Sequence, residues 1–342
     1  MDFTVSSIAL ALTAGFVAGT TGYIVGYSGA KAELRATPAV PSDKAEVVRA
    51  SASATPSSTD TSSAPPVPER LFKYIPATAD HHFAILERLD IRFSQPSVLN
   101  DPRDCRPHVV APADPNATVE QMLQRALSRY PRPPNPDQVS YARQQLLRAY
   151  TTDVEQRIAE SARVLRESMD RLGVLSLTDT PDNAVMWAHY SDNHRGFVIE
   201  FDTAYAPLTP QEGETAWEGR PVPVIYQENR VQVACDSASL ALPDEVVLVK
   251  TSAWQYEREW RVIRERSRAS RTVGAGAGEV SLFGIDARAI SALYVGADAP
   301  SATENRLRAI VAANPNLQHV RISRAEVSPQ GDIVVEPTSG TV

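Results

Sequence analysis

The chain has 342 residues, which is enough for one globular domain with additional segments. Its hydrophobic fraction of 43% is that of a protein with a packed core, whereas its net charge of −7 argues against a dedicated nucleic-acid binder. The two cysteines, Cys105 and Cys235, are too few for a disulfide framework and lack the CxxC spacing of a zinc or redox site. We therefore expect two buried thiols and no nucleic-acid partner.

Residues 1–30 are predicted to form a transmembrane anchor. The strongest apolar stretch, 8–27, has about the 20 residues that a helix needs to cross a bilayer. A cleaved signal peptide is the alternative, although the basic residues that normally begin one are missing. Lys31 and Arg35 follow the span and no Lys or Arg precedes it. The positive-inside rule then predicts a single-pass membrane protein whose C-terminal domain faces the cytoplasm.

Glycines in this span recur four residues apart, which lets a second helix approach closely and predicts a homo-oligomer contact. Glycine is also simply tolerated in membrane helices, so both interpretations stay open. The residues concerned are Gly15, Gly19, Gly22 and Gly26.

A linker over residues 31–69 is predicted to be disordered. Between 36 and 68 the composition is mostly Ala, Ser, Thr and Pro, with no aromatic residue. Such a segment cannot bury enough apolar surface to offset its ordering entropy. The globular domain is expected over 70–328, followed by a C-terminal tail over 329–342.

Helical and strand patterns alternate along the globular domain. Four helical regions are expected. The first covers 79–89, the second begins after a cap at Thr118, the third runs from Pro136 to about 172 with a break near Thr152, and the last covers 301–313. Most helices precede most strands, which favours an α+β domain of two small packed sheets with helices. Strands are expected at 71–74, 90–94, 174–178, 196–202, 222–226, 259–263, 280–283, 290–295 and 320–323.

Four stretches resemble the domain of unknown function 2971 family. They are LFKY at 71–74, LNDP at 99–102, MWAHYSDNHRGFVIEFD at 186–202 and KTSAWQYEREWRVI at 250–263. Their order and spacing agree with the family, and the resemblance spans roughly residues 70–327. It implies no activity, because the family is named for having none established. One departure is Arg103, where the family usually has an aromatic residue.

The last of these stretches concentrates carboxylates and aromatic side chains. On a strand, Glu257, Glu259 and Arg261 would share one face. An exposed, salt-bridged strand is one interpretation. The other is a carboxylate presented at the start of a strand, beside aromatic rings that bind a flat ligand. Glu200, inside an apolar strand pattern, is expected on a solvated face.

The order of elements is similar in outline to the ADP-ribosyltransferase superfamily. Those enzymes hold the nicotinamide ribose on an early strand, stack nicotinamide on a helix tyrosine, and begin a late strand with a catalytic glutamate, often as Glu-x-Glu. Lys73 stands where a histidine or arginine is usual. The resemblance implies NAD as a substrate and no other cofactor. It implies Glu259 as the catalytic carboxylate, Glu257 as its helper, and Tyr190, Lys73, Tyr74 and Trp254 in substrate binding.

Two other functions remain open from the sequence. A non-catalytic module could bind a nucleotide or a partner in the same aromatic cleft. A metal-dependent hydrolase could use His189, His194 and Asp101, although the two histidines do not have a known zinc spacing and no metal site is assigned.

Overall fold

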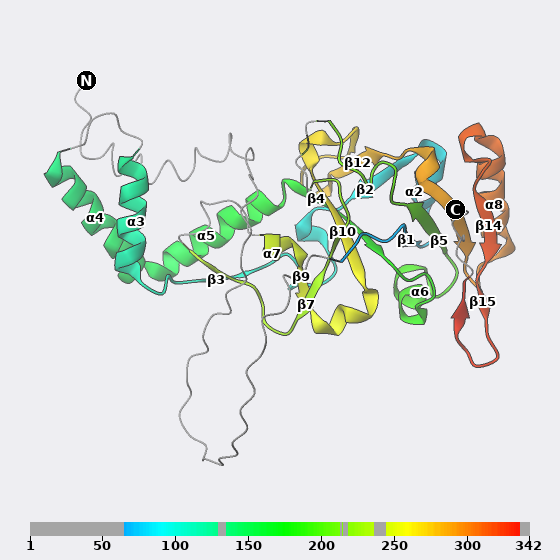
Figure 1. The fold of residues 1–342 in the computed structure, drawn as a ribbon, viewed down its shortest axis with the longest axis horizontal. Coiled ribbons are helices and arrows are strands. Elements are labelled where there is room, and N and C mark those ends of the chain that lie inside the picture. Colours follow the sequence, from blue (N-terminus) through cyan, green and yellow to red (C-terminus); the bar gives the residue numbers. More distant parts are fainter. Residues whose placement is uncertain (1–64, 129–134, 213, 215–217, 236–243, 336–342) are drawn as a thin grey trace, which may run out of the picture.

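The computed structural model describes residues 65–128, 135–212, 214, 218–235 and 244–335 (Figure 1). This part of the chain is α+β, with one seven-stranded sheet, one three-stranded sheet and three two-stranded sheets. The α-helices are α2 (Asp80–Arg88), α3 (Pro115–Leu127), α4 (Pro136–Thr151), α5 (Val154–Met169), α6 (Ala184–Tyr190), α7 (Asp244–Leu248) and α8 (Ser301–Ala313).

The large sheet has the order β14-β13-β5-β1-β4-β10-β6. Its strands are β1 (Arg70–Ile75), β4 (Leu172–Thr178), β5 (Phe197–Asp202), β6 (Val222–Pro223), β10 (Glu259–Glu265), β13 (Ile290–Val295) and β14 (Arg321–Arg324). The smaller sheets contain β2 (Asp90–Phe93), β3 (His108–Val110), β7 (Ile225–Gln227), β8 (Gln232–Ala234), β9 (Val249–Thr251), β11 (Arg271–Val273), β12 (Val280–Gly284), β15 (Glu326–Val327) and β16 (Ile333–Val334).

The sheet opens between β1 and β4. β1 pairs with β5 along its whole length, but it pairs with β4 at one position, Phe72 opposite Thr178. Further along β4, Val174 pairs instead with Ser94. The other edge of β4 pairs continuously with β10. The two strands therefore separate beyond Phe72, and this gap positions the candidate site.

The two faces of the large sheet are packed differently. One face carries a single apolar cluster that also includes residues of α2, α8, β2 and β12. The opposite face carries two apolar clusters, one around α6 and one around α3, α4 and α5. Alternation along β10 directs Glu259 and Arg261 to this second face, between the two clusters. Two buried charges thus lie where the apolar packing is interrupted.

Most of the local predictions are confirmed. Asn135 accepts a hydrogen bond from the Asp137 backbone N–H and begins α4, whose C-terminal cap is Thr152. The start of α3 was predicted wrongly. Asp114, rather than Thr118, caps it by accepting from two backbone N–H groups, because Pro115 can occupy the first helical position.

Two predictions about the fold are wrong. The domain is built on one large sheet with several small ones, not on two small packed sheets. Among the described residues no helix is long and apolar enough to cross a membrane. The longest helices, α4 and α5, have 16 residues each and carry several charges. This finding contradicts the predicted single-pass anchor and membrane localisation.

The predicted anchor over 1–30, its four glycines and nearly all of the 31–69 linker lie outside the described residues. The two cysteines are described, and both are free and buried, as predicted. Glu200 was predicted wrongly. Its carboxylate is fully buried and accepts a 2.5 Å hydrogen bond from the Tyr294 hydroxyl of the neighbouring strand β13.

Candidate functional site

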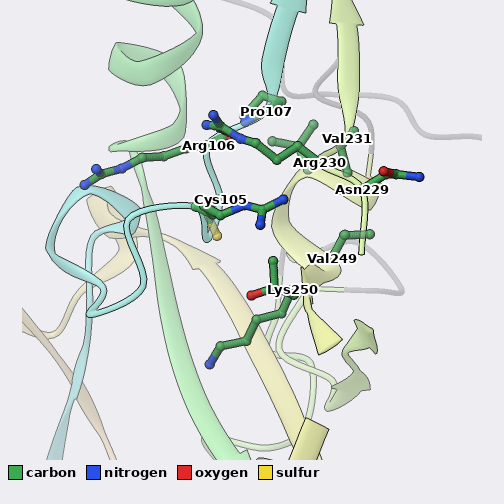
Figure 2. Close-up of a pocket in the computed structure, with 11 residues that line it drawn as sticks. Cys105, Arg106, Pro107, Asn229, Arg230, Val231, Val249 and Lys250 are labelled. Atoms are coloured by element: carbon green, nitrogen blue, oxygen red, sulfur yellow. Dashed lines mark hydrogen bonds between the residues drawn. The ribbon is translucent and has the colours of Figure 1, made fainter. Parts of the chain in front are cut away.

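A cavity of about 180 Å³ occupies the gap between β1 and β4. The loop over 99–104, helix α6 and the start of β10 border it, and both predicted glutamates line it. A smaller, arginine-lined hollow is bordered by strand β9 (Figure 2). The Lys250 side chain extends away from the arginines that are labelled there, and its amine binds the two glutamates of the cavity.

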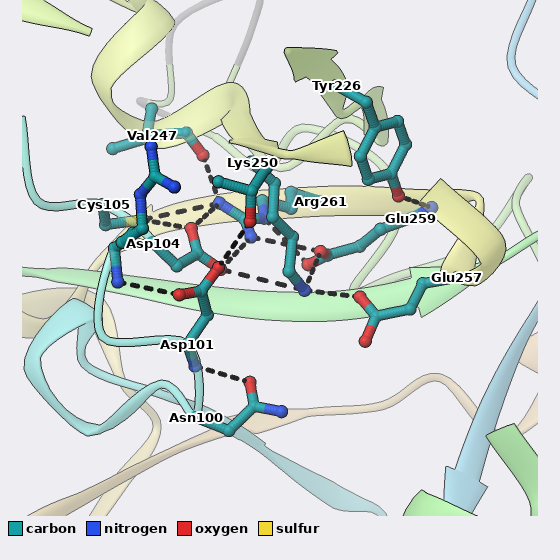
Figure 3. Close-up of polar contacts among 12 residues, drawn as sticks. Asn100, Asp101, Asp104, Cys105, Tyr226, Val247, Lys250, Glu257, Glu259 and Arg261 are labelled. Atoms are coloured by element: carbon teal, nitrogen blue, oxygen red, sulfur yellow. Dashed lines mark hydrogen bonds and ion pairs between the residues drawn. The ribbon is translucent and has the colours of Figure 1, made fainter. Parts of the chain in front are cut away.

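Arg261 holds one side of the cavity rigid by pairing with two carboxylates (Figure 3). Its guanidinium contacts both oxygens of Asp104 at 2.6 and 2.9 Å, and both oxygens of Glu259 at 2.8 and 3.1 Å. The Val247 carbonyl accepts a further bond at 2.7 Å. All these side chains are at least 96% buried. Bidentate pairing of this kind satisfies the geometry of both groups.

Lys250 links the two glutamates. Its amine contacts Glu257 in a short ion pair and Glu259 at 3.0 Å, and it lies 3.9 Å from Asp104. Burial alone would lower the pKa of Lys250, but Glu259 and Glu257 outweigh it and raise that pKa. The lysine therefore stays protonated and brings the two glutamate side chains to one point.

Glu257 is not on the strand that carries Glu259. It ends a 3₁₀ helix (Ser252–Glu257), and Arg258 then adopts a left-handed conformation with φ of 44°. This turn directs both glutamates into the cavity. The Tyr190 hydroxyl donates to Glu257 and accepts from the Asn100 amide at 3.0 Å, so the tyrosine ring is fixed from both sides.

The two glutamates differ in their ionisation. Burial would raise the pKa of Glu259, but Arg261 and Lys250 lower it to about 2. Burial does raise the pKa of Glu257, because Lys250 and Tyr190 only partly offset it. Environments that drive two carboxyl pKa values apart are typical of sites that assign them separate roles. Glu259 is a fixed anion, whereas the raised pKa of Glu257 means that it takes up a proton at a higher pH than an ordinary glutamate does.

Lys73 fills the break in the sheet. Its amine donates a 3.0 Å hydrogen bond to the Ser176 carbonyl, at the point where β1 no longer pairs with β4. Burial is the main cause that lowers the pKa of Lys73 from 10.5 to about 8. A lysine amine with so low a pKa is unusual outside functional sites, and this one faces the same cavity as the glutamates.

Replacing Lys73 with methionine is expected to stabilise the protein at neutral pH. Between about pH 8 and 10.5 the unfolded chain binds a proton on Lys73 that the folded chain has released, so the wild-type free energy of unfolding rises with pH. Below pH 8 the folded protein carries the full cost of a partly desolvated ammonium. After allowing for the lost hydrogen bond, Lys73→Met should gain up to about 2 kcal/mol near pH 7.

This gain should disappear above pH 10.5, where Lys73 is neutral in both states. Urea unfolding of both proteins across this pH range measures it. Arg88→Met, at an exposed position, is the control and should leave the pH dependence of the wild type in place. Parallel wild-type and Lys73→Met curves between pH 8 and 10.5 would show that Lys73 is not desolvated.

The structure brings together most of the predicted site residues, with one exception. Lys73, Tyr74, Tyr190, Glu257 and Glu259 all line the cavity. The Tyr74 hydroxyl donates to the Thr180 carbonyl at 3.1 Å, so this hydroxyl is already engaged by the backbone. Trp254 does not line the cavity; its ring lies 5.0 Å from the Lys250 amine and covers it.

The residues of the metal hypothesis do not meet. His189 bonds the Tyr256 hydroxyl at 3.2 Å, while His194 stacks on Trp187. Asp101 accepts from the Thr251 hydroxyl at 3.2 Å. Within the described ranges, no three His, Cys, Asp or Glu side chains are arranged to hold a metal ion.

Four residues of the site were not predicted from the sequence: Asn100, Asp104, Lys250 and Arg261. Asn100 lies in the LNDP stretch, whose Asn, Asp and Pro are equally typical of an ordinary turn without a functional role. Lys250 begins the KTSAWQYEREWRVI stretch, seven residues before Glu257. A lysine in a segment with two nearby glutamates was the available signal, but its side-chain direction depends on the 3₁₀ helix that follows it.

Residues 186–262 match the model of the family described as Protein of unknown function (DUF2971). The match contains Tyr190 on α6, Lys250, Glu257 at the end of the 3₁₀ helix, and Glu259 at the start of β10. The 71–74 and 99–102 stretches, which supply Lys73 and Asn100, lie outside it. No curated protein and no solved structure matches the chain. The comparisons thus support the DUF2971 resemblance and give no support to the ADP-ribosyltransferase resemblance.

Proposed function

We propose that the cavity binds the nicotinamide end of NAD and that the protein cleaves the bond between nicotinamide and ribose. The observation that carries this proposal is the environment of Glu257. It is a buried carboxylate with a raised pKa that lines a cavity and is hydrogen-bonded to a fixed tyrosine. A carboxylate in such a place can stabilise a cation that develops on a sugar.

The size and lining of the cavity suit one flat ring. A protein cavity of about 150 Å³ is known to hold benzene, so about 180 Å³ has room for a ring of this size but not for a dinucleotide. Phe72, Tyr74 and Tyr190 contribute aromatic surface, and Asn100 contributes an amide. The rest of NAD would lie outside, beyond the opening.

The chemistry assigns different tasks to the two glutamates. When the ribose–nitrogen bond breaks, its electron pair stays on the ring, neutral nicotinamide leaves, and positive charge develops on the ribose. Ionised Glu257 stabilises that charge, and its raised pKa suits it to accept the proton of an attacking water. Glu259 is a positioning residue that holds Lys250 and Arg261. These roles are the reverse of those inferred from the sequence.

A non-catalytic nucleotide-binding module is the second candidate, and one observation favours it. Lys250 neutralises Glu257 and Glu259 together, as in a structural ion-pair cluster. This candidate predicts NAD binding without release of nicotinamide. Incubating the full chain with NAD while measuring binding by calorimetry and free nicotinamide by chromatography separates the two candidates. Absence of binding at about millimolar NAD would contradict both.

Tyr190 provides a test of how the ring is held. Tyr190→Ala should weaken NAD binding by about 10-fold or more, because stacking on one aromatic ring contributes about 1–3 kcal/mol. Tyr190→Phe should bind almost normally and turn over more slowly, because Glu257 loses its hydroxyl partner. Tyr141→Ala removes an exposed tyrosine as a control. Equal binding by wild type and Tyr190→Ala, measured by calorimetry, would show that no ring stacks there.

A further inference from the structure

The arginine-lined hollow is outside the NAD cavity and unused by the proposed chemistry. It lies between the loop over 103–107, residues 229–231 and strand β9 (Figure 2). Arg103, Arg106 and Arg230 contribute to its lining, and no Asp or Glu side chain does so among the described residues. Such a concentration of one sign of charge in a concave place attracts ions of the opposite sign.

Backbone carbonyl groups hold these arginines in place. Arg230 donates to the Arg106 carbonyl from Nε at 3.1 Å and from Nη2 at 2.5 Å. In the opposite direction, Arg103 donates to the Glu228 carbonyl at 3.0 Å. The two guanidinium groups therefore span the same gap between two chain segments. The neighbouring β3–β8 pairing fixes those segments further, so the site is largely preorganised.

The charges of these arginines are not neutralised. In the part of the chain that the structure describes, Arg103, Arg106 and Arg230 form no ion pair with a carboxylate. Arg106 instead donates to the Ser97 carbonyl at 2.9 Å. Elsewhere in the same domain, Arg264 and Arg271 each pair with a carboxylate within 2.7 Å. Unpaired guanidinium groups around one hollow repel each other, and each retains N–H donors that its carbonyl does not use.

We propose that this hollow is an anion site that binds a phosphate group, either as inorganic phosphate or as a phosphate monoester. Guanidinium groups present forked donors that match phosphate oxygens, and a dianion would relieve their mutual repulsion. The site is separate from the cavity, although the loop over 100–106 borders both: Asn100 and Asp104 face the cavity, and Arg103 and Arg106 line the hollow. The proposal does not depend on NAD cleavage.

The double variant Arg103→Gln with Arg230→Gln tests the site. A glutamine amide nitrogen lies about where arginine Nε does, so at position 230 it can still donate to the Arg106 carbonyl, whereas the Arg103 contact from Nη2 is lost together with its charge. Calorimetric titration of the full chain with inorganic phosphate at low ionic strength should show binding that weakens as NaCl is added. The double variant should bind at least about 10-fold more weakly. Glycerol 3-phosphate, titrated in parallel, shows whether a monoester or the free ion is preferred.

Arg88→Gln with Arg125→Gln is the matched control, because it removes two charges at exposed positions of α2 and α3. It should bind phosphate like the wild type. If the glutamine double variant has a lowered melting temperature, Arg103→Lys with Arg230→Lys replaces it and should show intermediate affinity. The proposal fails if the wild type does not bind either compound at about 10 mM, or if the control loses as much affinity as the test variant.

Discussion

Glu257→Gln is expected to lower the rate of nicotinamide release from NAD by about 100- to 1,000-fold while leaving the melting temperature near that of the wild type. The amide cannot stabilise a cation as a carboxylate does. Lys250 nevertheless keeps Glu259 as an ionic partner at 3.0 Å, so the fold should tolerate the loss. Chromatographic assay of nicotinamide, with a thermal melt of the same sample, measures both effects.

Glu259→Gln is the informative comparison. Glu259 makes two bonds to a fully buried guanidinium, so its neutralisation should lower the melting temperature as well as the rate. The assignment of roles would be reversed if Glu259→Gln kept full stability and lost turnover while Glu257→Gln remained active. That result is the one that the Glu-x-Glu pattern alone predicts.

The pH dependence of turnover carries the same information. Because the pKa of Glu257 is raised above 4.5, its carboxylate is lost as pH falls through a value higher than that of an ordinary glutamate. The acid limb of the rate profile should therefore lie above pH 4.5. Glu259, with a pKa of about 2, remains ionised across this range and cannot produce such a limb. An acid limb well below pH 4.5 would argue against Glu257.

The sequence predicted local elements well because their signals are local. Asn183 caps α6 by accepting from the Met186 backbone N–H at 3.1 Å, a contact across three residues. Sheet order had no comparable signal. β1 lies between β4 and β5, and its pairing with β4 breaks off at Phe72. That break makes the cavity, and it depends on strands a hundred residues apart in the chain.

The candidate site was partly predictable for a related reason. Glu257 and Glu259 stood out because aromatic residues and carboxylates are crowded in one short segment. Asp104 did not, because its partner Arg261 is 157 residues away. The sequence also allowed an exposed, salt-bridged strand, but the burial of Glu257, Glu259 and Arg261 rules this interpretation out. Strand β6 pairs with that end of β10, and α7 and the 99–104 loop pack beside it. Alternation gives the face of a strand but not what packs against it.

Arg261→Met is expected to cause the largest loss of stability of any single change considered, about 3–5 kcal/mol in the free energy of unfolding. The methionine fills a similar volume but leaves Asp104 and Glu259 as buried carboxylates without their guanidinium. Lys250, at 3.9 Å from Asp104 and 3.0 Å from Glu259, can compensate only in part. Urea unfolding near pH 7 measures the effect.

Arg258→Met is the matched control three residues away. Arg258 also pairs with a carboxylate, Asp179 at 2.7 Å, but its side chain is 63% exposed. Exposed ion pairs contribute at most about 1 kcal/mol, so this variant should lose little. Similar losses in the two variants would show that burial does not distinguish the two pairs and that Arg261 does not hold the site together.

The difference between wild type and Arg261→Met should also depend on pH. In the wild type the lowered pKa of Glu259 contributes stability that is present above pH 4.5 and is lost as pH falls toward 2. Without Arg261 the pKa of Glu259 rises, so the folded variant binds a proton on Glu259 at a higher pH than the wild type does. This protonation removes a buried charge and so reduces the variant's loss of unfolding free energy. The gap between the two unfolding free energies should therefore be widest above pH 5 and should narrow by pH 3. A gap that stays constant across this range would mean that Arg261 stabilises the fold by packing, not by holding the two carboxylates in their ionised form.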